Sequence, residues 1–170
     1  MENGFVLKVD YKNETKILNI LNSDLFNKCL KRSFILQKEQ LKNYGDGWKI
    51  YVIDILKGYI FIDIIDLELF KRTLSKCKEI FKLNNQNKIR LVKLKKRDLM
   101  FLDEFNLPVI KNSTGDIKDG KIVVNKGPLM KKEKMIRKVD RHKRLAFLNY
   151  QFSFENYDIC FGLEIKNKEV

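Results

Sequence analysis

The sequence is poor in proline, glycine, cysteine and histidine, and each shortage excludes a class of protein. Two prolines and eight glycines among 170 residues exclude collagen-like and proline-rich low-complexity chains. Three scattered cysteines and a single histidine, His142, provide no Cys/His ligand set for zinc, so we expect no bound metal. An odd, sparse set of cysteines is typical of a reducing compartment, which favours the cytoplasm.

Long apolar runs are also lacking. The longest run, around residues 51–65, is interrupted by Asp54, Lys57 and Asp63, whereas a transmembrane helix needs about 20 apolar residues. The first ten residues carry neither the basic region nor the apolar core of a secretory signal. We therefore expect no membrane partner.

Combinations of residues that are typical of an active site are absent as well. The sequence contains no P-loop and no GxGxxG motif, and His142 has no nearby nucleophile to activate. We interpret His142 as a polar loop residue or as a group that stacks on nucleic acid. The acidic pairs Asp63/Asp66 and Asp103/Glu104 are interpreted as helix caps or solvated side chains. We therefore expect no enzyme and no cofactor.

Positive charge is what the chain has in excess. It contains 35 Lys and Arg against 22 Asp and Glu, a net charge of +13, which favours nucleic acid or an anionic membrane surface as partner. Residues 126–144 alone contain nine basic and two acidic side chains, a net charge of +7. A solvated face would explain an isolated lysine pair, but a local run of one sign suits contact with phosphates.

The turns in this segment predict that its cations come together. Gly127-Pro128 and Asp140-Arg141 are interpreted as turns that bring two basic loops to neighbouring positions at one end of a small barrel. Asp140 is expected to orient Arg141 or to cap its turn. The residues that we predict to bind RNA are Lys126, Lys131, Lys132, Lys134, Arg137, Lys138, Arg141, His142, Lys143 and Arg144.

Hydrophobic periodicity divides the chain into two domains. Strand-like runs alternate with helical patterns in residues 1–108, which predicts an α+β N-terminal domain in which helices flank an antiparallel sheet. The polar residues 109–119 are interpreted as a linker. Four or five short strands in residues 120–170 predict a small all-β barrel.

Two stretches of the basic region carry a family resemblance: GKIVVNKGPL at residues 120–129 and KVDRHKRLA at residues 138–146. They resemble the KOW motif of the NusG transcription factors, and most of all the LoaP branch of specialised antiterminators. The ending Gly162–Ile165 also resembles that branch, and Leu56–Ile62 is similar to the PGY strand of the family, with Lys57 in place of proline. Lys131 stands where related sequences have glycine.

Lys134 is a second departure of this kind. A turn built for glycine tolerates positive φ, whereas lysine is strained there. The two lysines therefore predict a strained or reshaped loop with additional positive charge.

The resemblance implies a transcription processive antitermination and elongation factor. Its NusG N-terminal-like domain would dock on the clamp helices of the largest RNA polymerase subunit through Leu56, Tyr59 and Phe61. For Tyr59 and Phe61, ordinary core packing is the alternative. Its KOW domain, an SH3-like barrel, would bind an RNA hairpin in a leader transcript.

The same resemblance implies a bacterial cytoplasmic monomer that associates with the nucleoid through RNA polymerase, and a contact with the DNA backbone near the polymerase. The alternative is a general NusG-like elongation factor whose KOW domain docks a ribosomal or termination-factor protein instead of RNA.

Overall fold

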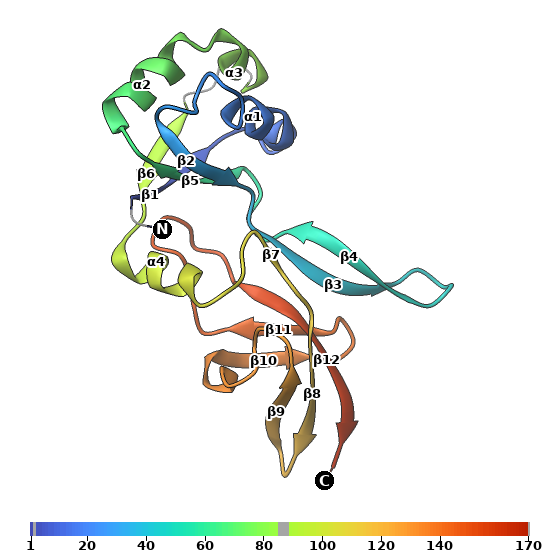
Figure 1. The fold of residues 1–170 in the computed structure, drawn as a ribbon. Helices are drawn as coiled ribbons and strands as arrows, with labels where there is room; N and C mark the ends of the chain where they lie inside the picture. The colour runs from blue at the N-terminus through green and yellow to red at the C-terminus, as the bar shows by residue number, and fades with distance from the viewer. Residues whose placement is uncertain (2, 85–88, 170) are drawn as a thin grey trace. The chain divides into compact units, whose positions relative to one another are not determined.

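A computed structural model describes residues 1, 3–84 and 89–169 of the chain (Figure 1). The contacts divide the chain into two compact units, and neither unit is one continuous stretch. Unit 1 contains Met1–Leu36 and Leu56–Asp103, and unit 2 contains Gln37–Ile55 and Glu104–Val170.

Unit 1 contains a four-stranded antiparallel sheet with the strand order β2-β5-β1-β6. The strands are β1 (Gly4–Lys8), β2 (Leu30–Phe34), β5 (Tyr59–Ile64) and β6 (Arg90–Lys93), and the helices are α1 (Glu14–Leu21), α2 (Leu67–Lys76), α3 (Lys78–Leu83) and α4 (Lys96–Asp103). Ile17 and Phe70 lie in one buried cluster with Ile60 and Ile62 of β5. Burial of these side chains is the main stabilising contribution in unit 1.

Two local predictions in unit 1 are confirmed. The Asp66 side chain caps α2 by accepting a hydrogen bond from the backbone N–H of Leu69 at 2.9 Å. A glycine inside a strand-like run, Gly58, predicts a bend, a bulge or a close backbone approach. Gly58 has φ +81°, and a Cβ there would come within 2.9 Å of the Val9 carbonyl oxygen. Glycine is therefore required at this bend.

Unit 2 contains two sheets. The five-stranded sheet has the order β10-β11-β12-β8-β9 and the three-stranded sheet has the order β4-β3-β7. The strands are β3 (Gln37–Asn43), β4 (Trp48–Asp54), β7 (Val109–Ile110), β8 (Ser113–Lys118), β9 (Lys121–Lys126), β10 (Ile136–Asp140), β11 (Leu145–Leu148) and β12 (Cys160–Lys168), and a 3₁₀ turn, η1, covers Glu133–Met135.

Strand β3 attaches the β3–β4 hairpin to the five-stranded sheet. The buried Lys38 ammonium donates a hydrogen bond to the Cys160 carbonyl at 2.8 Å, and the backbone N–H of Asn112 donates to the Glu39 carboxylate at 2.9 Å. A Cβ at Gly162 would collide with the Glu39 carbonyl and the Asn112 side chain. The close approach of β3 to β12 therefore depends on glycine at position 162.

The fold class expected from the sequence is wrong. We expected an α+β N-terminal domain with an antiparallel sheet flanked by helices, followed by a small all-β barrel; instead the structure is mostly β. It has 40% of residues in strands and 21% in helices, with three sheets and a half-barrel. One reason is β3, whose sequence QKEQLKN has no apolar alternation to mark it as a strand.

The segment expected as a linker also differs. Residues 109–119 contain β7 and β8, and β8 is paired on both sides, in parallel with β12 and antiparallel with β9. Its residues STGDIK are mostly polar, so they carry no apolar pattern that marks a strand. The strand joins the sheet through backbone hydrogen bonds, which do not depend on apolar side chains. In the part of the chain that the structure describes, no helix is long and apolar enough to cross a membrane.

Candidate nucleic-acid interface

The residues predicted to bind RNA lie along β10, which is an edge strand of the five-stranded sheet, and on its two connections, except for Lys126, which ends β9 (Figure 1). The β9–β10 loop precedes β10 and the turn 141–144 follows it, so the two loops lie at opposite ends of this strand. Five residues of strand separate them by about 17 Å. The expectation that both loops gather at one end of a barrel is therefore wrong, and the cations form a stripe instead.

We call this set the basic stripe. It consists of Lys126, Lys131, Lys132, Lys134, Arg137, Lys138, Arg141, His142, Lys143 and Arg144. Three of its cations have acidic partners: Lys132 pairs with Glu104 at 2.6 Å, Arg137 with Asp158 at 3.0 Å, and Arg144 with Glu164. These three are partly neutralised within unit 2.

The other six cations of the stripe are exposed. Among the described residues, none of these six forms an ion pair. The six are Lys126, Lys131, Lys134, Lys138, Arg141 and Lys143. Five of them lie on β10 and its two connections, and Lys126 lies at the end of β9, where the β9–β10 loop begins. This geometry can follow the backbone of an extended polyanion.

Both acidic side chains of residues 126–144 are occupied by backbone N–H groups. Backbone hydrogen bonds to the Glu133 carboxylate, from its own N–H and from that of Val124 at 3.1 Å, lower the pKa of Glu133. The Lys143 N–H, which donates to Asp140 at 2.9 Å, and the charge of Lys143 lower the pKa of Asp140. The predicted capping of the turn by Asp140 is confirmed, and the two acids fix the loops of the stripe.

The backbone at both ends of β10 is strained. Lys131 has φ +65° and Arg144 has φ +52°, in the left-handed region that L-residues rarely adopt. The positive φ that the glycine position predicted is found at Lys131, whereas Lys134 lies in η1 and is not among the positive-φ residues.

The start of the β9–β10 loop is packed against β8. Gly127 has φ +102°, and a Cβ there would come within 2.7 Å of the Ser113 Cα. The next turn residue, Leu129, is fully buried, and its backbone N–H donates to the Ser113 hydroxyl at 3.2 Å. This turn therefore holds one end of the stripe in place.

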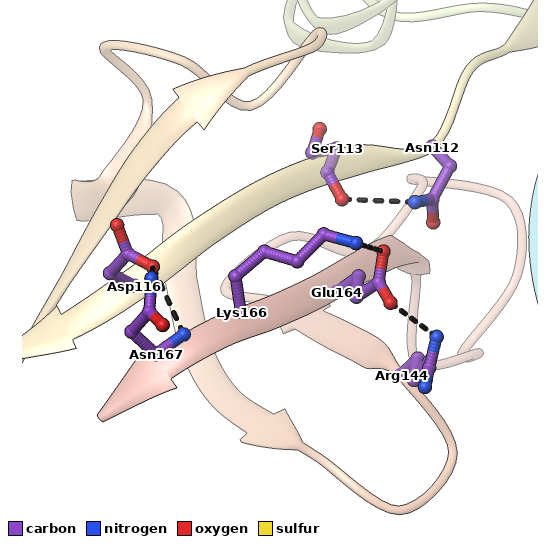
Figure 2. A network of polar contacts seen from close by, with 7 residues as sticks. All are labelled: Asn112, Ser113, Asp116, Arg144, Glu164, Lys166 and Asn167. Atoms are coloured by element: carbon purple, nitrogen blue, oxygen red, sulfur yellow. Dashed lines mark hydrogen bonds and ion pairs between the residues drawn. The ribbon is translucent and has the colours of Figure 1, made fainter.

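An aromatic residue, Trp48, lies at the end of the stripe formed by the turn 141–144. The guanidinium carbon of Arg144 is 3.6 Å from the ring centroid of Trp48, which follows the hairpin turn and is 41% exposed. Figure 2 shows Glu164 between Arg144 and Lys166, which it binds at 2.7 Å. Sequence reasoning missed Trp48 and Lys166, because each is about 20 residues or more away from the basic segment along the chain.

A second polar network holds the strands that support this end of the sheet. The Asp116 carboxylate of β8 accepts a hydrogen bond from the Asn125 side chain at 2.6 Å. It also accepts from the Asn167 backbone at 3.0 Å and from the Asn167 side chain at 2.9 Å, and Figure 2 shows Asp116 beside Asn167. The bond from Asn125, together with those from Asn167, lowers the pKa of Asp116. The network ties β8, β9 and β12 together.

The residues predicted to bind RNA polymerase belong to unit 1 and are buried. Leu56, Tyr59 and Phe61 are 3, 5 and 0% exposed, and the Phe61 ring stacks on Phe34 with centroids 5.5 Å apart. The structure therefore does not present them as an exposed surface. The packing alternative that the sequence left open for Tyr59 and Phe61 agrees with this burial.

Comparison with known proteins adds no relative to this geometry. No family model matches the chain, and no curated protein matches it. The resemblance to the NusG factors therefore stays a prediction based on the residues of the sequence.

Proposed function

We propose that the basic stripe binds RNA and that the chain is a NusG-like processive antitermination factor of the LoaP type. The observation that supports RNA binding is the charge of the stripe. Six exposed cations, none of which forms an ion pair among the described residues, lie on β10, on its two connections and at the end of β9. Both acids of residues 126–144 accept hydrogen bonds from backbone N–H groups. A surface of this kind has one sign of charge toward a ligand.

The stripe suits a nucleic-acid backbone better than a small anion. Its cations extend over about 17 Å of β10 and beyond at both ends, and a row of phosphates matches that length. Lysines supply point charges, whereas Arg141 can form two hydrogen bonds to one phosphate or to a guanine edge. Binding should therefore release several counterions and weaken steeply with salt.

The role in transcription rests on the sequence resemblance alone. The resemblance implies RNA polymerase and an RNA hairpin in a leader transcript as partners, and an association with the polymerase in the bacterial cytoplasm. We assign polymerase docking to no residue, because the predicted residues Leu56, Tyr59 and Phe61 are buried in the structure. Purification of RNA polymerase with a tagged full chain tests this part separately.

The alternative function is docking of a ribosomal or termination-factor protein. It is favoured by apolar side chains that are exposed on the strands of unit 2. Trp48, Ile50 and Val52 of β4 are 41, 57 and 52% exposed, and Val123 of β9 is 38% exposed. A protein-docking surface is expected to show such residues.

The experiment that tests RNA binding is a titration of the full chain with a hairpin from the leader of its own transcript, over a series of salt concentrations. We expect the logarithm of the association constant to fall linearly with the logarithm of the salt concentration, by roughly 0.7 to 0.9 per phosphate contact. Affinity for the hairpin that does not change with salt, or no binding at low salt, would favour the protein-docking alternative.

A further inference from the structure

One end of the basic stripe lies next to an exposed apolar strip on β4. Trp48, Ile50 and Val52 alternate along this strand, so their side chains share one face of the hairpin. They are 41, 57 and 52% exposed. Single exposed apolar residues are ordinary on a protein surface, but three on one face form a patch that calls for a partner. We call these three residues the apolar strip.

Arg144 joins the apolar strip to the stripe. Its guanidinium carbon lies 3.6 Å from the Trp48 ring centroid, so it covers part of one ring face, and Glu164 holds the guanidinium in place. Arg141 begins the four-residue turn that Arg144 ends, and the ends of such a turn are within about 7 Å of each other. An exposed indole therefore lies beside cations on a fixed backbone.

We propose that the apolar strip binds unpaired bases of RNA, with one base stacked on Trp48 and the flanking phosphates bound by the turn cations. This inference rests on the proposed binding of RNA by the stripe, and it specifies which part of the RNA is bound at this end. Single-strand binding sites combine aromatic platforms with a positively charged groove in this way. A guanidinium on the ring strengthens such a platform through cation–π attraction.

The chemistry of the surface distinguishes unpaired bases from paired ones. In a duplex the faces of the bases are stacked inside the helix, so an indole at the surface finds only backbone and groove edges. An unpaired loop exposes base faces and keeps one phosphate for each base. The apolar strip and the turn beside it match these two components.

The charge beside the strip favours RNA over a protein strand as its partner. A protein that covered Trp48 and Ile50 would also cover the exposed Arg141 and Lys143, and burial of unpaired charges costs free energy unless the partner supplies acids. RNA supplies a phosphate at each nucleotide without further selection of sequence.

The test uses the full chain and two RNA probes. Trp48 is the only tryptophan of the chain, so its fluorescence reports directly on the proposed site. The probes are an oligouridine of about 12 nucleotides and a blunt RNA duplex with the same number of phosphates. We expect the oligouridine to quench Trp48 fluorescence to saturation, and the duplex to bind with little quenching.

Variants then separate stacking from charge. Trp48→Ala should lower oligouridine affinity by roughly 5- to 150-fold, the range for loss of one base stack, and leave duplex affinity unchanged, as measured by fluorescence anisotropy of labelled RNA. Trp48→Phe keeps an aromatic platform and should retain most of the affinity. Tyr51→Ala is the matched control, because Tyr51 is 36% exposed on the opposite face of β4, against Tyr44.

The outcomes for stacking and for RNA binding differ. If both probes lose affinity in Arg141→Ala/Lys143→Ala but neither responds to Trp48→Ala, base stacking is overturned and RNA binding by the stripe stands. Equal losses of oligouridine affinity in Trp48→Ala and Tyr51→Ala also overturn the assignment to the apolar strip. If neither probe binds the wild-type chain at low salt, the proposed RNA binding fails and the stacking fails with it.

Discussion

Two exposed parts of unit 2 differ in almost every property that a partner would sense. Residues 126–144 carry a net charge of +7, whereas the hairpin residues 37–55 contain three lysines and three acids and are neutral. The hairpin instead exposes apolar side chains on β4, at the edge of its own sheet. Arg144 on Trp48 is the contact that joins these two surfaces.

The difference shows how affinity and selectivity can be divided between the two surfaces. Contacts to phosphates give affinity that depends on salt and little on sequence, whereas contacts to bases or to apolar groups select the partner. The stripe has the residues for the first task and the apolar strip for the second. Changes confined to one surface should therefore leave the contribution of the other unchanged.

The largest expected effect comes from removing charge at the turn. Arg141→Ala/Lys143→Ala should weaken binding of a hairpin RNA by at least ~100-fold, because each of the two lost hydrogen bonds to a charged group contributes about 1.5–3 kcal/mol. The slope of log K against log salt should become shallower by the contribution of two phosphate contacts, roughly 0.7 to 0.9 for each. Electrophoretic shifts over a salt series measure both quantities.

Lys16→Ala/Lys28→Ala is the matched control for this variant. Both lysines are exposed in unit 1, and the pair removes the same charge from the chain. If this control weakens binding as much as the turn variant does, net charge rather than the stripe is responsible.

The sequence predicted the cations and the turns but not their placement. Two features could be predicted because they are local in the sequence: the charge of residues 126–144 and the Gly127-Pro128 turn. The two basic loops lie at opposite ends of β10, and this placement follows from the pairing of β10 with β11, which no local pattern specifies. The stripe was therefore predicted as a set of residues and not as a shape.

The exposure of the hairpin could not be predicted from the sequence, for a physical reason. The alternation of Trp48, Ile50 and Val52 is typical of a half-buried strand, yet these side chains are exposed. Periodicity shows that residues share a face but not whether anything covers that face. The pairing of β3 with β7, about 70 residues away, depends on backbone hydrogen bonds that leave no signal in the side chains.

A smaller effect is expected where the hairpin meets the five-stranded sheet. In Gly162→Ala the new methyl group meets the Glu39 carbonyl and the Asn112 side chain. We expect the free energy of unfolding to fall by about 1–3 kcal/mol, as for other overpacked sites. Thermal melting, followed by circular dichroism and by Trp48 fluorescence, measures the loss.

Gly120→Asn is the control for the added side chain. Gly120 has φ +72° with no atom within 4 Å of a Cβ, and asparagine tolerates this conformation. The proposed attachment of the hairpin by β12 would be contradicted if Gly162→Ala melts at the same temperature as this control.

Acid should weaken the loops of the stripe. The pKa values of Glu133 and Asp140 are lowered in the folded chain, chiefly by backbone N–H groups. The two ionised carboxylates therefore contribute fully to the free energy of unfolding above the ordinary carboxyl range near pH ~4. This contribution is lost as the pH falls through the lowered pKa values. The melting temperature should fall in that range, and the fall should be smaller in Asp140→Asn.

Asp119→Asn, in the β8–β9 turn, provides the comparison for this pH series, since it removes an exposed acid outside the stripe. A pH dependence that is reduced as much by Asp119→Asn as by Asp140→Asn would mean that total charge, and not the capped turn, sets the acid sensitivity.

The smallest effect is expected at Lys131, where charge and backbone strain oppose each other. Its φ of +65° is unfavourable for lysine and free of cost for glycine. Lys131→Gly should therefore raise the free energy of unfolding by up to about 1 kcal/mol, while RNA affinity falls by the contribution of one phosphate contact. Lys131→Ala loses the same charge but keeps the strained backbone, so it should bind RNA as Lys131→Gly does without the gain in stability. Melting temperatures and salt-dependent titrations of the three chains separate the two contributions. If Lys131→Gly binds RNA as tightly as the wild type, Lys131 does not contact phosphate. The strained lysine would then contribute nothing to RNA affinity.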